Sequence, residues 1–241
     1  MSEKWTFQTL AASAVDAASK IQNQVQSEYG STKAAIGYWL MIDLIGSAAF
    51  RQRAHEEPAF RRALIFSRLI DLLAGGYGDQ VHVFKHLGDG VLAYATHFRP
   101  LLEIVLLMDA VKAHWSVEVM KDPTFPTLNS RAAMTFGECL KVGDDYQGRP
   151  LDQVARLSAY ASTDPDVVAV VSAEVRRNVA AEYRRQYPFV KFGETFRATN
   201  LAKPGETPPV IAEVCIDQAA RRDFSLYFDG ARAVLWSGTR T

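Results

Sequence analysis

The chain has 241 residues, carries 27 Lys and Arg against 27 Asp and Glu, and is 48% hydrophobic. This length fits one large domain or two small ones with a sizeable core. A formal net charge of zero argues against a protein that its overall field holds on nucleic acid, because such binding needs a large excess of cations. Any basic site must therefore be local.

The sequence gives no indication of a disulfide framework, a secretory signal or a membrane-spanning segment. The two cysteines, Cys139 and Cys215, cannot form a disulfide framework, and neither has a neighbour at the spacing of a zinc site. The N-terminus lacks the basic start and apolar run of a secretory signal. The longest apolar stretch, residues 101–108, contains Glu103 and is far shorter than the roughly 20 residues that span a bilayer. We expect a soluble, cytoplasmic protein with no membrane and no nucleic-acid partner.

The first third of the chain predicts a helix, a strand and a second helix. Apolar residues at spacings of three and four predict an amphipathic helix over residues 5–27. We assign residues 1–30 to a helical extension of a domain that covers residues 31–241. Residues 36–42 form a continuous apolar run that predicts a buried central strand ending at Asp43. A second helix is predicted from Pro58 to the glycine pair 75–76.

The middle of the chain predicts a hairpin, a long helix and two more strands. Strand-like runs at 81–85 and 91–94 flank the turn sequence Gly88-Asp89-Gly90. A helix from Pro100 to about Met120 is hydrophobic all round, which predicts burial in the core or in a dimer contact. Strands are then predicted over 131–136 and 138–142, with Gly137 between them.

The last third predicts a helix over 151–158, a strand over 167–171, a helix over 173–186 and a strand-like tail from Phe189. The order of elements predicts an α+β fold with a ferredoxin-like βαββαβ core. In this fold one mixed sheet carries helices on one face.

Two aspartates are the first candidates for chemistry. Asp43 closes a buried strand, and residues 44–50 form a glycine-containing loop into a helix start that can direct N–H groups at an anion. Taken alone, a strand-end Asp more often caps a helix. If the hairpin lies beside strand 36–42, however, Asp89 comes close to Asp43. Such a pair could hold Mg²⁺ or Mn²⁺ together with substrate phosphates.

Four motifs in order, between about residues 36 and 215, resemble the class III nucleotidyl cyclases. Each motif alone is weak, but four in the same order are fairly specific. The matching segments are Leu40-Met-Ile-Asp43-Leu-Ile-Gly46, Lys85 through Asp89, Arg131-Ala-Ala-Met-Thr-Phe-Gly137-Glu138, and Gly148 through Leu157 with Asp152 and Arg156.

The resemblance implies a role for each matching position. Asp43 and Asp89 would bind two divalent ions, Mn²⁺ or Mg²⁺, with the Leu44 carbonyl as a further ligand. Arg156 would stabilise charge on the α-phosphate in the transition state. The family has Asn where this chain has Asp152, which puts the ribose-orienting amide in doubt because a carboxylate only accepts hydrogen bonds. The residues that would bind the triphosphate are Ile45, Gly46, Ser47 and Lys203.

The implied reaction is an internal phosphoryl transfer. The ribose 3′-OH attacks the α-phosphorus in line and pyrophosphate leaves, with no protein nucleophile. In this family the site forms between two catalytic domains. The resemblance therefore implies a homodimer with two shared sites, in which Asp43 and Asp89 come from one subunit and Lys85, Asp152 and Arg156 from the other.

The base-contacting positions of the family fall on Lys85 and Asp145. A donor beside an acceptor suits adenine, uracil and cytosine, whereas guanine is usually met in this family with Glu at the Lys85 position. Phe50 either narrows the base pocket or is a core aromatic at a helix start.

The overall organisation and the unusual Asp152 resemble the stand-alone bacterial pyrimidine cyclases of antiphage defence, whose product activates a separate effector. We expect a uridylate cyclase that makes cyclic UMP. Cytidylate cyclase, adenylate cyclase, an inactive nucleotide-binding regulator and a pure interaction protein stay open as alternatives.

Overall fold

The computed structural model describes residues 17–18, 20–24, 27, 33–54, 56–114 and 128–217. The predicted helix over 5–27 lies mostly outside these residues, and the described ones within it, at 17–18, 20–24 and 27, are helical. The proposed boundary between an extension and a domain at residue 30 also lies outside the described residues, as do the end of the helix predicted to reach Met120 and the last part of the tail.

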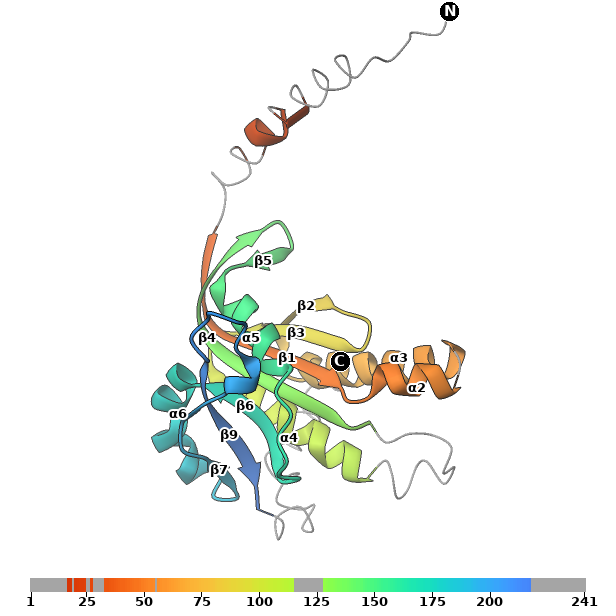
Figure 1. Cartoon of the computed structure of the whole chain (residues 1–241), viewed down its shortest axis with the longest axis vertical. Helices are drawn as coiled ribbons and strands as arrows, with labels where there is room; N and C mark the ends of the chain where they lie inside the picture. The colour runs from red at the N-terminus through yellow and green to blue at the C-terminus, as the bar shows by residue number, and fades with distance from the viewer. Residues whose placement is uncertain are drawn as a thin grey trace, which may run out of the picture.

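In the described part of the chain, nine strands form one sheet at the centre of the molecule (Figure 1). Its main path runs β2-β3-β1-β4-β6-β9-β7, with β5 paired to β4 and β8 paired to β9. Strands β4 and β6 pair in parallel, and the other pairs are antiparallel. The strands are β1 (Lys33–Leu44), β2 (His82–His86), β3 (Gly90–Ala95), β4 (Ser130–Val142), β5 (Asp145–Gln147), β6 (Val167–Ser172), β7 (Val190–Phe192), β8 (Phe196–Arg197) and β9 (Val210–Ile216).

Strand β1 is the central strand that the sequence predicts. It lies between β3 and β4. Adjacent residues of a strand point to opposite faces, and Trp39 and Leu40 are both fully buried. Both faces of the sheet are therefore covered at β1, which explains the unbroken apolar run.

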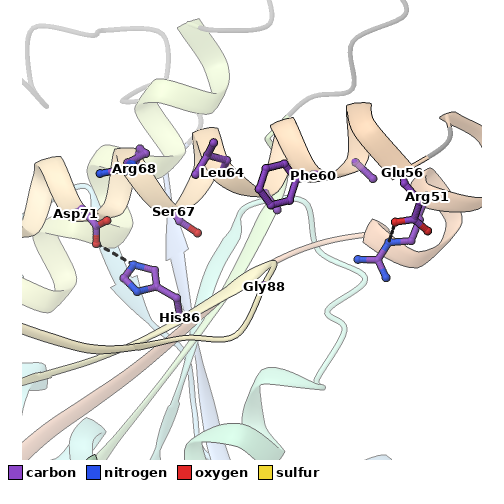
Figure 2. Close-up of a pocket in the computed structure, with 11 residues that line it drawn as sticks. Arg51, Glu56, Phe60, Leu64, Ser67, Arg68, Asp71, His86 and Gly88 are labelled. Atoms are coloured by element: carbon purple, nitrogen blue, oxygen red, sulfur yellow. Dashed lines mark hydrogen bonds and ion pairs between the residues drawn. The ribbon is translucent and has the colours of Figure 1, made fainter. Parts of the chain in front are cut away.

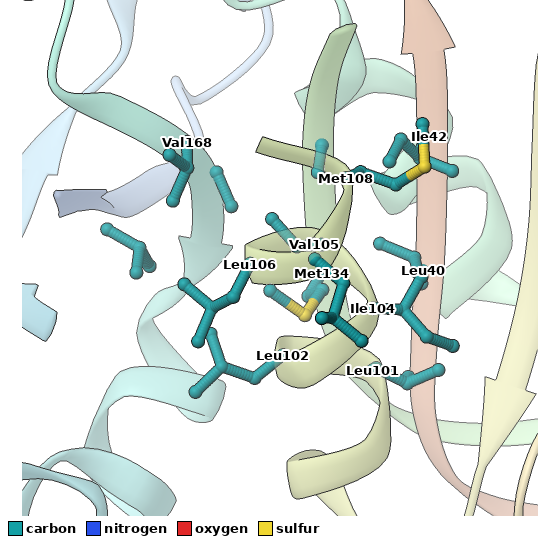
Figure 3. Close-up of a cluster of buried hydrophobic side chains, with 14 of the residues drawn as sticks. Leu40, Ile42, Leu101, Leu102, Ile104, Val105, Leu106, Met108, Met134 and Val168 are labelled. Atoms are coloured by element: carbon teal, nitrogen blue, oxygen red, sulfur yellow. The ribbon is translucent and has the colours of Figure 1, made fainter. Parts of the chain in front are cut away.

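One face of the sheet carries helices α3 (Glu56–Gly75), α4 (Phe98–His114) and α6 (Ala173–Gln186). Helix α4 is central to this layer. Figure 3 shows its apolar side chains, Leu102 and Ile104 among them, packed with Leu40 of β1, Met134 of β4 and Val168 of β6. Burial in the core thus accounts for the all-round hydrophobicity of this helix, as one of the two predicted explanations requires.

The opposite face carries helix α5 (Arg149–Ser158). Val154 and Leu157 of α5 pack in a separate cluster with Ala133 of β4 and Val170 of β6. The predicted α+β class, with a mixed sheet and helices, is confirmed, but the helices occupy both faces. Between residues 33 and 217, the described part of the chain also contains helix α2 (Ser47–Ala54) and the 3₁₀ turns η1 (Gly78–Gln80) and η3 (Thr199–Leu201). Among the described helices, none has both the length and the apolar character of a membrane-spanning segment.

The prediction of two strands over 131–136 and 138–142 is wrong, because both ranges belong to β4. Gly137 is not a turn. It pairs with Gly37 of β1, and a Cβ atom on Gly137 would lie 2.7 Å from Cγ of Pro150. This glycine therefore marks the close approach of α5 to the sheet. Strand β5, which the sequence reasoning missed, is only three residues long.

Candidate active site

Asp43 and Asp89 lie together at one end of β1 and β3. Asp43 pairs with Gly90 in the antiparallel register, which confirms the strand pairing assumed from the sequence. The main-chain N–H of Leu44 donates to the Asp89 carbonyl at 2.9 Å. A Cβ atom on Gly90 would lie 3.2 Å from Oδ1 of Asp43. The fold thus brings the two predicted metal carboxylates into one neighbourhood.

The environment of Asp43 is partly buried and contains charges of both signs. Its side chain is 14% exposed. Burial raises the pKa of Asp43, the hydrogen bond from Arg131 lowers it, and the neighbouring Asp89 carboxylate raises it, with a net increase. Arg131 lies directly opposite on β4 and donates Nη2 and Nε to Oδ2 of Asp43 at 2.9 and 3.2 Å. From the sequence, Arg131 was only the first residue of a motif.

The donor set fits a hard divalent cation that substrate phosphates help to bind. Among the described residues, no group of three or more His, Cys, Asp and Glu side chains could hold a metal ion. Two carboxylates and a carbonyl are nevertheless a sufficient protein contribution for Mg²⁺ or Mn²⁺, since such ions in nucleotide sites take further oxygens from phosphates and water. The Leu44 carbonyl accepts the Ser47 hydroxyl at 3.2 Å and keeps a second lone pair.

The loop after Asp43 directs the chain into α2. Gly46 has φ of 74°, a left-handed conformation that favours glycine. The N–H of Ile45 donates to the Asn129 carbonyl at 2.8 Å, so this amide is already engaged. The first amides of a helix have no acceptor inside the helix. Of the predicted triphosphate residues in this loop, Gly46 and Ser47 are thus better placed than Ile45 to offer an N–H group.

Phe50 lies on α2 and is buried. Its ring faces the guanidinium of Arg62, which lies 5.4 Å from the ring centroid. The ring contacts found around Lys85 and Asp145 come from other aromatic residues. This placement supports the core-aromatic explanation of Phe50 over a role in the base pocket.

Lys85 and Asp145, the predicted base-contacting residues, form an ion pair. Lys85 Nζ lies 2.6 Å from Asp145 Oδ2, and each side chain is 45% exposed. The hydrogen bond from Lys85 holds the pKa of Asp145 below its usual value. The chain thus presents a donor and an acceptor side by side at the surface.

An aromatic cluster supports this ion pair. The rings of Phe84 and Tyr146, the residues next to Lys85 and Asp145 in the chain, have centroids 4.8 Å apart. Trp39 contacts both rings and donates its Nε1 hydrogen to the Gly137 carbonyl at 3.0 Å. Sequence reasoning missed this cluster, because its rings come from strands far apart in the chain.

A large cavity of about 1260 Å³ lies beside α5, α6 and the turn that contains Lys203. Asp152, Arg156 and Lys203, three of the predicted site residues, line it together. Glu206 of the same turn also lines it and forms an ion pair with Arg156. The lining residues, all from the described part of the chain, include neither Asp43 nor Asp89. The predicted site is therefore divided between two regions of one chain.

A second cavity, of about 470 Å³, lies between helices α2 and α3 and the β2–β3 hairpin. Figure 2 shows Phe60, Leu64 and Asp71 of α3 along one side and His86 and Gly88 of the hairpin opposite. His86 Nε2 lies 3.0 Å from Asp71 Oδ1. Gly88 directly precedes Asp89 in the chain, but the described residues that line this cavity include neither Asp43 nor Asp89.

Comparison with known proteins relates the fold to nucleotide cyclases. A scan against protein-family models gives no match, and a search of curated proteins finds no significant similarity. Among solved structures, the chain is similar to the adenylyl cyclase CyaB from P. aeruginosa, with 16% identity and a TM-score of 0.57 over 78% of this chain and 97% of that one.

Two further structures extend this similarity. An adenylate/guanylate cyclase/hydrolase from Silicibacter pomeroyi shows 18% identity and a TM-score of 0.59 over 78% of this chain and 100% of that one. Adenylate cyclases from Trypanosoma brucei in their monomeric state show 16% identity and a TM-score of 0.52 over 74% and 86%. The chain therefore has the fold of class III cyclase catalytic domains.

Proposed function

We propose that the chain is a nucleotide cyclase that converts UTP into 3′,5′-cyclic UMP and pyrophosphate. The observation that carries this proposal is the proximity of Asp43 and Asp89 at the end of β1, directly before the loop into α2. The cavity that gathers Arg156 and Lys203 supplies the complementary cations. Retention of both aspartates and of Arg156 favours an active enzyme over an inactive nucleotide-binding regulator.

The reaction needs no covalent intermediate with the protein. The ribose 3′-oxygen forms a bond to the α-phosphorus, the bond from that phosphorus to the bridging oxygen breaks, and the hydroxyl proton passes to solvent. Divalent cations held by Asp43, Asp89 and the Leu44 carbonyl would favour ionisation of the hydroxyl and neutralise phosphate charge. The amides of Gly46 and Ser47 bind phosphate oxygens, and Arg156 offsets the charge that grows around the α-phosphorus.

A homodimer completes the site in this proposal. The carboxylate pair and the Arg156 cavity are separate regions of one chain, so a second copy brings its Arg156, Lys203 and Asp152 to the Asp43 and Asp89 of the first. In this proposal the second copy also contributes Lys85 and Asp145, which contact the base. Two identical sites follow from the two-fold symmetry of such a dimer.

The preference for a pyrimidine rests on resemblance to the pyrimidine cyclases of antiphage defence. In that role the cyclic nucleotide activates a separate effector. The adjacent donor of Lys85 and acceptor of Asp145 match O4 and N3–H of uracil, but they match cytosine and adenine equally well. Cytidylate and adenylate cyclase are therefore the alternatives that the same site supports.

Incubation of the purified protein with Mn²⁺ and each of the four ribonucleoside triphosphates, followed by mass spectrometry, tests the proposal. We expect cyclic UMP and an equal amount of pyrophosphate from UTP. Cyclic AMP as the main product would contradict the pyrimidine assignment and keep the cyclase. Absence of every cyclic nucleotide would contradict the cyclase itself.

A further inference from the structure

Arg62 of α3 is a buried cation to which the proposed mechanism gives no role. The residue is 3% exposed. Burial of an arginine is costly unless its guanidinium finds acceptors and compensating charge. The groups around Arg62 therefore indicate what this side chain does.

The guanidinium contacts the loop that joins Asp43 to α2 and also the first turn of α2. Its Nη2 atom donates to the Ile45 carbonyl at 3.1 Å. The centre of the same guanidinium lies 5.4 Å from the centroid of the Phe50 ring, within the range of a cation–π contact. Ile45 and Phe50 lie on either side of Gly46 and Ser47, the residues proposed to bind phosphate.

Ile45 is held through both of its main-chain polar groups. Its N–H donates to the Asn129 carbonyl at 2.8 Å, and its carbonyl accepts from Arg62. The next residue, Gly46, adopts a left-handed conformation, and its carbonyl accepts from the Phe50 N–H at 2.9 Å. The direction of the amides that follow Ile45 depends on these contacts, because rotation of the Ile45–Gly46 peptide would break the bond from Arg62.

The charge of Arg62 also acts on the carboxylate pair. Burial lowers the pKa of Arg62, and the neighbouring Asp89 carboxylate offsets part of this decrease. A fixed cation close to Asp89 balances part of the negative charge of the pair. The guanidinium thus links the carboxylates and the loop.

We propose that Arg62 is a positioning residue that fixes the segment from Ile45 to Phe50, the loop and the first turn of α2, so that the Gly46 and Ser47 amides are preorganised for a metal-bound triphosphate. The ligand in this proposal rests on the proposed function. The conformational part concerns the loop alone and has its own measurement.

Three variants of the full chain test the proposal. Arg62→Met removes the donors and the charge at similar volume, and Arg62→Lys keeps the charge but loses the planar guanidinium. Arg61→Met is the matched control, since Arg61 is the exposed neighbour on α3 that pairs with Glu57. For each variant we would measure thermal unfolding, hydrogen exchange of the amides from Gly46 to Phe50, and binding of Mn²⁺ alone and of Mn²⁺ with inorganic tripolyphosphate.

We expect Arg62→Met to speed exchange at these amides and to weaken tripolyphosphate binding about tenfold, the loss typical of a hydrogen bond to a charged group. Binding of Mn²⁺ alone should not weaken in Arg62→Met, because this change removes a cation close to the carboxylates. Arg62→Lys should give an intermediate loss of tripolyphosphate binding, and Arg61→Met should match the wild type. Wild-type exchange in both Arg62 variants would overturn the proposal, and so would an equal effect of Arg61→Met. Faster exchange in a protein that makes no cyclic nucleotide would support the positioning role and refute the proposed function. If Arg62→Met does not fold, hydrogen exchange and tripolyphosphate binding of Arg62→Lys test the proposal.

Discussion

The charge of Asp43 lowers the stability of the fold, although the proposed metal binding needs this charge. Its pKa is raised in the folded chain, first by burial and then by Asp89, against the hydrogen bond from Arg131. A carboxyl group with a raised folded pKa contributes most to stability when protonated. Stability is lost as pH rises from the unfolded value of 3.8 through the higher folded value. At neutral pH the ionised Asp43 therefore costs stability, as is common for a group kept for function.

Asp43→Asn should remove this cost, because the amide carries no charge and its oxygen still accepts from Arg131. We expect a melting temperature above that of the wild type at pH 7, with a difference that shrinks as pH falls toward 3.8, while Mn²⁺ binding and turnover are lost. Thermal scans over this pH range and a metal titration measure both effects. The exposed Asp79→Asn is the control. A less stable Asp43→Asn protein at pH 7 would refute the electrostatic explanation.

Glu206 forms an ion pair with Arg156, whose guanidinium binds phosphate in the proposed mechanism. Its carboxylate pairs with Arg156 at the edge of the large cavity, and the turn before it is closed by the Glu206 N–H donating to the Lys203 carbonyl at 3.0 Å. A triphosphate must displace this carboxylate. The pair is partly exposed, so the competition it imposes is modest.

Glu206→Gln should strengthen inhibition by pyrophosphate, because the neutral amide competes less for Arg156. A pair of this exposure is worth up to about 1 kcal/mol, which corresponds to an inhibition constant lower by about two- to fivefold. Glu57→Gln is the matched control, since Glu57 pairs with Arg61 and neither of these two residues lines the large cavity. Product-inhibition kinetics measure the change. Weaker inhibition by pyrophosphate in Glu206→Gln would contradict competition between Glu206 and phosphate for Arg156.

Site residues that belong to a motif or close a strand could be predicted from the sequence. The residues that form ion pairs with them in the fold could not. Asp43 and Asp89 each close a recognisable pattern, and their proximity needed only the correct strand pairing. Arg131 and Glu206 depend on the register between strands and on a turn conformation. These are set by long-range packing, which local spacing does not encode.

At the scale of elements, Gly137 lies inside β4 at its contact with α5, whereas the sequence predicted a break between two strands at this residue. Helix α3 was predicted almost to both of its ends and α4 almost to its start, because apolar residues repeat at helical spacing over many residues. The predicted end of α4 lies outside the described residues. Gly137 misled because a strand glycine is compatible with a turn and with a close approach of backbone or ring. The Pro150 ring would lie 2.7 Å from a Cβ atom placed on Gly137, so this glycine permits a close approach and does not form a turn.

Gly137→Ala should therefore destabilise the fold. Its φ of 154° disfavours other residues, and the rigid Pro150 ring cannot move aside without shifting the start of α5. We expect a loss of about 1–3 kcal/mol in the free energy of unfolding. Urea unfolding measures it. Gly75→Ala, at the end of α3 where a Cβ atom would meet nothing within 4 Å, should be neutral or stabilise by about 0.5–1 kcal/mol, and equal effects of the two changes would contradict this explanation.

At the scale of the whole molecule, the fold separates the groups that the chemistry needs. The carboxylates lie where β1 ends and β3 begins, whereas Arg156 and Lys203 line a cavity beside α5, α6 and the turn that contains Lys203. The order of elements was enough to predict the sheet class, because alternating strands and helices permit few arrangements. The distribution of helices over both faces, and the short strand β5, follow from tertiary packing.

Complementation between two inactive variants tests the shared-site model most directly. Asp43→Ala and Arg156→Ala should each abolish cyclic nucleotide formation while the proteins stay folded. After mixing and subunit exchange, half of the dimers are mixed and each contains one intact site, so about a quarter of the wild-type rate should return. A mixture as inactive as its components, despite demonstrated exchange, would contradict the shared site, as would full activity of a strictly monomeric wild type.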